Sequence, residues 1–391
     1  MTEVKKISSS SLLAIMSIAF ISMGIGTITP AIQSIIEAHP GLPVTTVLLV
    51  STLPSLLVIP ASLIAGAVAG SKVKYKALAS VGIALFVIGG VLPAFINNNF
   101  TVILVERAIF GIGLGIISPL GNALILGLYE GQERASKLGL WTIIANVGGI
   151  VLQFLGGWFA GMKWYYSFYP HALGIISLIL VLMFLPEPGL HGAGESAERP
   201  KAKIGKKVWL ISVLFGISML LIYPLLVNMS TYLQLRGFGG SAVSGVVLSF
   251  YTIGGMLAGV AFGKLYKVSG RYIIATAAIT MAIGLAIVLY GPNIVLVTIG
   301  VTLAGFAFSI LMPAVMMIIG MVVNPESFAV ASSVLIAVMN LLAFLSTYWI
   351  GLIGNITGDA VVAPISVGMI IFAVAGITFI FLNPIPKQED S

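Results

Sequence analysis

Two charged side chains lie next to each other inside a long apolar run of this sequence. They are Glu106 and Arg107, in the run 101–126. If the run crosses a membrane, a cation there costs roughly 2.5–3.5 kcal/mol unless it faces a polar cavity, so the pair indicates a functional site. Arg107 is a candidate to bind an anionic substrate group, and Glu106 is a candidate proton carrier. The alternatives are that Arg107 snorkels to the nearby interface and that Glu106 is an exposed or lipid-facing acid.

Neutral polar side chains are spread through the other apolar runs. Amides and tyrosines there either bind a substrate or make helix–helix hydrogen bonds, which contribute about 0.6 kcal/mol on average. The methionines around Met316 suit either a promiscuous apolar cavity or ordinary packing. The candidates for a substrate cavity are Gln33, Gly111, Asn122, Asn146, Tyr223, Asn228, Tyr251, Met316 and Asn340.

Several kinds of chemistry have no residues to carry them. The chain has no cysteine, which excludes disulfides, thiolate metal sites and a cysteine nucleophile. The three histidines are scattered, so no metal site is predicted, and His171 is expected to be an isolated member of an aromatic belt at the outer membrane surface. The glycine-rich segment 111–115 lacks the Lys-Ser/Thr of a phosphate loop. We therefore expect neither a cofactor nor an enzyme.

The elements that position these residues are predicted to be membrane-spanning helices. Hydrophobic residues make up 59% of the 391 residues and charged residues only 8%, against about 25% charged in soluble proteins. A spanning helix needs about 20 apolar residues, and long runs without alternation favour helices over barrel strands. The sequence predicts an all-α protein with twelve spans: 11–37, 44–70, 77–96, 101–126, 138–161, 164–186, 208–235, 242–266, 272–291, 293–322, 329–353 and 362–383.

The basic residues predict the orientation of these spans. When twelve spans alternate, 16 of the 19 Lys and Arg residues fall on the side that carries both termini. That side is predicted to be cytoplasmic by the positive-inside rule. Because topology explains the net charge of +7, the lipid bilayer is the expected partner and nucleic acid is not.

The two halves of the chain repeat each other. Pro30 and Pro224 are 194 residues apart, and so are Asn146 and Asn340. The same separation relates Gly111 to Gly305, Pro119 to Pro313 and Gly157 to Gly351, and it shifts to 197 between Gly66 and Gly263. We predict an N-terminal six-helix bundle (1–186), a cytoplasmic linker (187–207) and a C-terminal six-helix bundle (208–391). Such parallel repeats are typical of transporters that bind substrate between the halves.

Short motifs give the sequence its resemblance to a family. The span that contains Arg107 reads Arg-Ala-Ile-Phe-Gly-Ile-Gly, and the loop after the eighth span reads Gly-Lys-Leu-Tyr-Lys-Val-Ser-Gly-Arg. These segments resemble the R-x-x-x-G-x-G and G-x-L-x-D-x-x-G-R/K motifs of the major facilitator superfamily, most closely its drug:proton antiporter branch. Both loops lack the acidic residue of the second motif, and the fifth span lacks the central Gly-Pro of the antiporter motif. The matching loop residues are Gly66, Lys74, Gly263, Gly270 and Arg271.

The resemblance implies how these residues would be used. By this resemblance, Arg107 would take part in proton coupling, and the candidate polar residues would line or flank a central cavity. The loops would hold the two halves together on the cytoplasmic side. It implies a multi-pass transporter of the plasma (inner) membrane, usually a monomer, that moves a small molecule. Proton-coupled efflux of small amphiphilic compounds is the first hypothesis, and proton symport of a small organic anion is the alternative. A membrane-embedded enzyme or sensor is a third possibility that leaves the repeat unexplained.

Overall fold

The computed structural model describes residues 8–187 and 205–382, and they form two compact units. Unit 1 contains residues 8–28 and 49–187, and unit 2 contains residues 29–48 and 205–382. The predicted bundle boundaries stay a prediction, because most of the linker lies outside the described residues. Sequence patterns did not indicate the boundary between the units at residue 28, which lies inside the first span.

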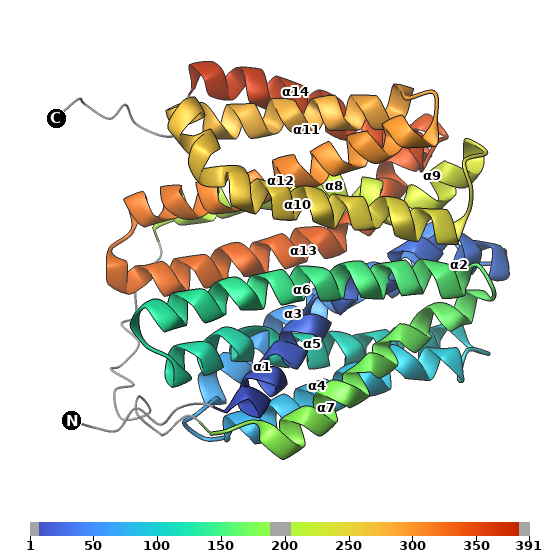
Figure 1. The fold of residues 1–391 in the computed structure, drawn as a ribbon. Coiled ribbons are helices and arrows are strands. Elements are labelled where there is room, and N and C mark those ends of the chain that lie inside the picture. Colours follow the sequence, from blue (N-terminus) through green and yellow to red (C-terminus); the bar gives the residue numbers. More distant parts are fainter. Residues whose placement is uncertain (1–7, 188–204, 383–391) are drawn as a thin grey trace. The chain divides into compact units, whose positions relative to one another are not determined.

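Unit 1 is built of helices that run almost parallel or antiparallel (Figure 1). Its first span begins with α1 (Ser9–Ser22) and enters a 3-10 helix, η1 (Gly24–Ala31), which contains Pro30. Its other elements are the greater part of α3 (Val44–Val68), α4 (Tyr75–Val91), η2 (Leu92–Ala94), α5 (Phe100–Leu128), α6 (Gly131–Ala160), η3 (Trp164–Ala172) and α7 (Leu173–Phe184).

Unit 2 contains the remaining helices. Its seventh span is interrupted four residues after Pro224, between α8 (Lys206–Val227) and α9 (Met229–Leu235). In the first span the related Pro30 lies in η1, the 3-10 segment between α1 and α2. Paired interruptions of this kind are a feature of transporter helices near a binding site. The other elements are α2 (Ile32–Ala38), α10 (Ser241–Ser269), η4 (Gly270–Tyr272), α11 (Ile273–Tyr290), α12 (Ile294–Val322), α13 (Pro325–Thr357) and α14 (Val362–Phe381).

The predicted number of spans is confirmed. Eleven helical stretches of the described residues are long and apolar enough to cross a membrane, and one of them, Ser241–Tyr290, is 50 residues long. At 1.5 Å per residue that stretch would be about 75 Å long, more than twice the thickness of the hydrocarbon core. It consists of two antiparallel spans, α10 and α11, which turn at Gly270 with a φ of 51°. The chain is therefore a multi-pass membrane protein with twelve spans, and their sidedness stays a prediction.

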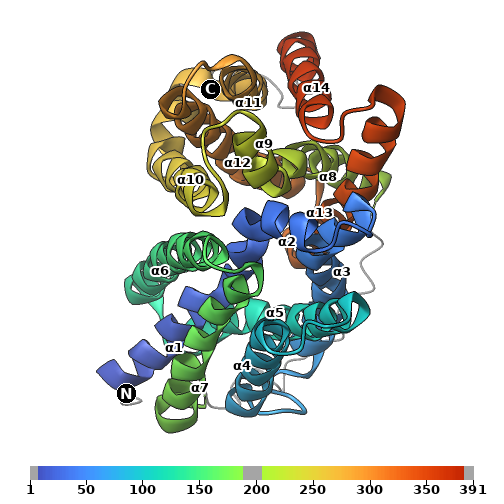
Figure 2. The same cartoon turned by 90° about the vertical axis from the view of Figure 1, so that its right-hand side faces the viewer.

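Glycines allow the helices of each unit to approach at backbone distance. A Cβ on Gly111 of α5 would lie 2.6 Å from the carbonyl oxygen of Pro54 in α3, and a Cβ on Gly113 would overlap the backbone of Phe86 in α4. Figure 2, which looks along the helices, shows α5 beside both neighbours. The glycines of this segment therefore let α5 pack closely against α3 and α4.

The same contacts recur in unit 2, which supports the internal repeat. Gly305 is the counterpart of Gly111 at a separation of 194, and Tyr251 is the counterpart of Pro54 at a separation of 197. A Cβ on Gly305 would overlap the carbonyl oxygen of Tyr251. The helix pair α3 and α5 of unit 1 and the pair α10 and α12 of unit 2 are thus packed through equivalent positions.

Gly148 gives a test of this packing. A Cβ at Gly148 of α6 would overlap the carbonyl oxygen of Phe20 in α1, whereas Gly139 of the same helix has nothing within 4 Å. We expect Gly148→Ala to lower the free energy of unfolding by about 1–3 kcal/mol through overpacking. The matched change Gly139→Ala should be neutral or stabilise by up to about 1 kcal/mol. Thermal unfolding of the two purified variants measures the difference, and equal melting temperatures would contradict the close approach.

Candidate functional site

Arg107 is completely buried inside unit 1. Its side chain has no exposed area, its Nε donates a hydrogen bond to the carbonyl oxygen of Val50 (2.9 Å), and its Cζ lies 4.0 Å from the centre of the Phe110 ring. The ring of Phe168 is 6.0 Å away. The guanidinium is therefore held by a cation–π contact and a hydrogen bond. It does not snorkel to an interface.

Glu106 is buried beside it without pairing with it. The side chain of Glu106 is 4% exposed, so the alternative of an exposed or lipid-facing acid is wrong. Consecutive helical residues point about 100° apart, and the described structure contains no ion pair between the two side chains. A carboxylate and a guanidinium thus lie inside one bundle, each without an opposite charge as direct partner.

His171 joins this cluster, which corrects the expectation that it belongs to an aromatic belt. It is completely buried, its Nδ1 is 2.9 Å from the carbonyl oxygen of Phe168, and its ring stands edge-on to the Phe110 ring at 5.0 Å. Space for it comes from Gly90 in α4, where a Cβ would lie 2.7 Å from the histidine Cβ. The pair Gly89-Gly90 is the sequence feature that could have indicated this position. Without a side chain at Gly90, α4 leaves room for the histidine of η3.

The polar atoms of this cluster are not all satisfied within the protein. Among the described residues, buried atoms without a hydrogen-bond partner include Nη1 and Nη2 of Arg107, Oε2 of Glu106 and Nε2 of His171. An unsatisfied buried polar group costs about 1–3 kcal/mol, and more if it is charged. A site that keeps donors, an acceptor and titratable groups at this cost is suited to bind an ion or to exchange protons.

The fold itself does not require these charges, as the repeat demonstrates. A Cβ on Gly89 would overlap the backbone of Glu106 and Phe110, and a Cβ on Gly284 of unit 2 would lie 2.9 Å from Gly300 O and from Ala304 N. The same helix contact is therefore made in both units. At the separation of 194, the counterparts of Glu106, Arg107 and His171 are Gly300, Val301 and Ile365. Uncharged residues serve the packing in unit 2, so this helix contact does not itself require the charges of unit 1.

The two related asparagines adopt the same local geometry. Nδ2 of Asn146 donates to the carbonyl oxygen of Thr142 (2.8 Å), and Nδ2 of Asn340 donates to that of Ile336 (2.9 Å). Each bond stays within its own helix, α6 or α13. The amides therefore do not join helices in the described structure, and each retains its oxygen for a further donor.

The other predicted cavity residues are placed differently. In unit 1, Asn122 is exposed and Gly111 is buried against α3. In unit 2, Asn228 is buried and donates to the carbonyl oxygen of Ala360 (2.9 Å), and Gln33 donates to Glu37 (3.0 Å). Tyr223, Tyr251 and Met316 are half-buried. Asn228 thus fixes the break between α8 and α9. That these residues line one substrate cavity stays a prediction.

The asparagine pair gives the second test. We expect Asn146→Ala and Asn340→Ala each to change the ratio of transport rates between two substrates by about fivefold or more, since one hydrogen bond contributes about 0.5–1.5 kcal/mol. Their melting temperatures should change little, because each amide bonds only within its own helix. Transport competition and thermal unfolding on the same preparations separate the two effects. Unchanged selectivity with a lower melting temperature would assign both residues to packing.

The loop motifs form turns, and one acid that sequence patterns did not indicate lies beside them. Lys74 is exposed at the start of α4, and Gly66 and Gly263 are exposed near the ends of α3 and α10. Nη2 of Arg271 donates to the hydroxyl of Tyr272 (2.7 Å). The carboxylate of Glu187 accepts hydrogen bonds from the backbone N–H groups of Tyr75 and Lys76, both at 3.0 Å. It caps α4 and provides negative charge next to a loop that lacks the acid of the motif.

Comparison with protein families gives one match across most of the chain. The model described as Major Facilitator Superfamily matches residues 14–347. Among curated proteins, the chain is 27% identical to the quinolone resistance protein NorA of Staphylococcus aureus over 124 residues. This aligned segment covers 32% of this chain and 32% of NorA. The chain is 31% identical over 86 residues to the multidrug transporter protein MdtP of Bacillus subtilis, which is 22% of this chain and 16% of MdtP. The chain thus spans a third or less of these relatives.

Comparison with solved structures shows the same fold over nearly the whole chain. The nucleoside transporter NupG has a TM-score of 0.75 at 13% identity, covering 97% of this chain and 100% of NupG. A D-xylose-proton symporter has a TM-score of 0.74 at 16% identity, covering 96% and 98%. At these identities the likeness concerns the fold alone. The family match indicates a transporter and not an enzyme.

Proposed function

The chain belongs to the major facilitator superfamily, and we propose that it is a proton-coupled exporter of small amphiphilic or drug-like compounds that works by alternating access. A transporter of this family has two helical bundles and moves small molecules across a membrane. The proposal adds the coupling ion, the direction and the class of substrate.

The buried cluster around Arg107 carries the proposal of proton coupling. Glu106 and His171 are titratable groups inside the bundle. Arg107 is a fixed cation whose Nη1 and Nη2 have no hydrogen-bond partner among the described residues. Their counterparts in unit 2 are uncharged at positions that make the same helix contact. A buried charge is unfavourable in either unit, so its presence in one unit alone supports a role in transport. Proton uptake and release at Glu106, with Arg107 holding its environment positive, is the simplest such role.

The direction and the substrate class are supported by the curated relatives. The printed names of NorA and MdtP describe quinolone resistance and multidrug transport. The apolar character of the spans and the methionines of α12 fit compounds without strong charge. Together these observations favour export of amphiphilic compounds from the cytoplasm. The same relatives support a place in the bacterial plasma membrane, and a monomer is the simplest assembly.

The unpartnered donors of Arg107 support one alternative, proton symport of a small organic anion. Nη1 and Nη2 form a planar fork that matches a carboxylate. In that case Arg107 would bind the substrate directly and Glu106 would carry the proton in the same direction. The two functions differ in the direction of proton movement relative to the substrate: opposite for export and the same for symport.

Proton flux in everted membrane vesicles distinguishes them. The lumen is acidified and followed with a pH-sensitive dye while a quinolone, a lipophilic dye or an organic anion is added outside. Export predicts that an added compound makes the lumen more alkaline. Symport predicts no such response, but an anion preloaded in the lumen should leave together with protons. If the lumen pH changed in neither experiment with any of the compounds, the result would contradict proton coupling.

A further inference from the structure

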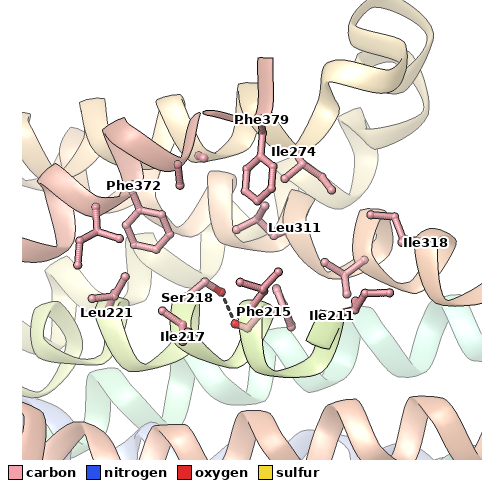
Figure 3. A pocket seen from close by; sticks show the side chains of 15 residues that line it. Ile211, Phe215, Ile217, Ser218, Leu221, Ile274, Leu311, Ile318, Phe372 and Phe379 are labelled. Atoms are coloured by element: carbon pink, nitrogen blue, oxygen red, sulfur yellow. Dashed lines mark hydrogen bonds between the residues drawn. The ribbon is translucent and has the colours of Figure 1, made fainter. Parts of the chain in front are cut away.

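Unit 2 contains an apolar groove that the proposed transport mechanism does not use. It has a volume of about 350 Å³ and lies between α8, α11, α12 and α14 (Figure 3). Ser218 is the one hydroxyl among its lining residues, and its Oγ donates to the carbonyl oxygen of Phe215 within the same helix (2.6 Å). The groove therefore offers no free hydrogen-bonding group and suits a hydrocarbon chain.

The length of the groove corresponds to one leaflet of a bilayer. Along α8 its lining extends from Ile211 to Leu221, which is about 15 Å at 1.5 Å per residue. The hydrocarbon core of a membrane is about 30 Å thick. Leu214 is 50% exposed and Ile371 is 37% exposed, so the groove is accessible from its side. One acyl chain of a lipid in that leaflet would fill it lengthwise.

One end of the groove lies beside a group of basic residues. Ile211 and Ile274 line that end. Lys206 and Lys207 are in the first turn of α8, four or five residues before Ile211, and Arg271 lies in η4, two residues before α11. Figure 1 shows the first turns of α8 and α11 and the last turns of α12 and α14 at the same end of unit 2.

The charges at this end are almost all positive. Five of the six Lys and Arg residues in the described part of unit 2 lie there, and Arg236 at the other end is the sixth. Glu326, in the first turn of α13, is the one acid in the described sequence at this end. Basic residues at the cytoplasmic ends of membrane helices attract anionic lipid headgroups.

We propose that this groove is a binding site for an anionic phospholipid, with one acyl chain between α8 and α14 and the phosphate held by Lys206, Lys207 and Arg271. The apolar lining provides affinity for any lipid chain, and the three cations provide selectivity for a negative headgroup. Since each Lys or Arg near the surface contributes about 1 kcal/mol toward an anionic lipid, losing two of them corresponds to a roughly 30-fold loss of selectivity.

Photocrosslinking of the full chain in lipid nanodiscs tests this proposal. Phosphatidylglycerol and phosphatidylcholine, each with the same diazirine-bearing acyl chain, are compared at equal amounts, and the labelled peptides are identified by mass spectrometry. We expect adducts on 211–221 and 371–379, at least about tenfold more abundant with phosphatidylglycerol. The double variant Lys206→Ala/Lys207→Ala should bring that ratio close to one.

Two further variants make the result specific. Lys264→Ala/Lys267→Ala removes the same charge from the end of α10 and should keep the preference for phosphatidylglycerol. Ala375→Phe fills the groove from α14 and should abolish the adducts while leaving the cations in place. Three results would each overturn the proposal. The two lipids could label the unaltered chain equally, or both double lysine variants could lose the preference for phosphatidylglycerol equally. The adducts could also be unaffected by Ala375→Phe. Equal labelling that a transported amphiphile suppresses would assign the groove to substrate instead.

Discussion

Replacement of Arg107 by leucine is expected to abolish proton-coupled transport while leaving the protein folded. The side chain donates from Nε to Val50 O and stacks on Phe110, and a hydrogen bond from a charged group contributes about 1.5–3 kcal/mol. We expect substrate-induced alkalinisation in everted vesicles to fall by at least about tenfold. The melting temperature should stay the same or rise, because a buried charge without a full set of partners is often replaced by an apolar residue at no cost.

The repeat supports this separation of transport from stability. Val301 occupies the related position in unit 2 and is completely buried, so an apolar residue is compatible with this packing. Arg134→Leu is the matched control, since Arg134 donates to Leu126 O and Tyr129 O at the end of the same helix. It should retain transport. Normal coupling in Arg107→Leu, or loss of coupling only together with unfolding, would remove Arg107 from the coupling site.

The number and type of the helices follow from the sequence because the membrane imposes one rule on every span. A run of about 20 apolar residues must satisfy its backbone groups internally, and only a helix does so within one segment. The observed α12 begins at Ile294, one residue after the predicted start at 293, and the observed α14 begins at the predicted residue 362. The largest disagreement is at α6, which begins at Gly131 and not at 138. The polar turn 131–137 is helical because a helix can extend beyond the apolar core.

Which side chains lie inside each unit could be predicted from the sequence only in part. Hydrophobicity hardly varies around these helices, so composition does not indicate which face is buried. The burial of His171 depends on Gly90 in another helix, and the capping of α4 depends on Glu187, more than 100 residues along the chain. Contacts of this kind are decided by tertiary packing. Arg107 was identified from the sequence because a lone cation in an apolar run is unfavourable wherever it points.

Replacing Glu106 by glutamine is expected to separate substrate movement from proton movement. The carboxyl is buried and its Oε2 has no partner among the described residues, so its ionisation depends on whether water or a proton can reach it. Glutamine has the same shape but does not titrate at physiological pH. We expect substrate-induced proton release to fall at least about tenfold, while exchange of labelled for unlabelled substrate continues at a similar rate.

The matched control for this change is Glu133→Gln in the first turn of α6, where the acid is exposed. It removes the same charge from the same unit and should alter neither measurement. If Glu106→Gln kept full proton release, the proton would have to be carried elsewhere, and His171 would be the remaining titratable group of the cluster. If it lost exchange as well as proton release, Glu106 would be needed for substrate binding or for the conformational change itself. Only loss of proton release with retained exchange supports a carboxyl whose protonation couples the two movements, because exchange requires alternating access without net proton transfer.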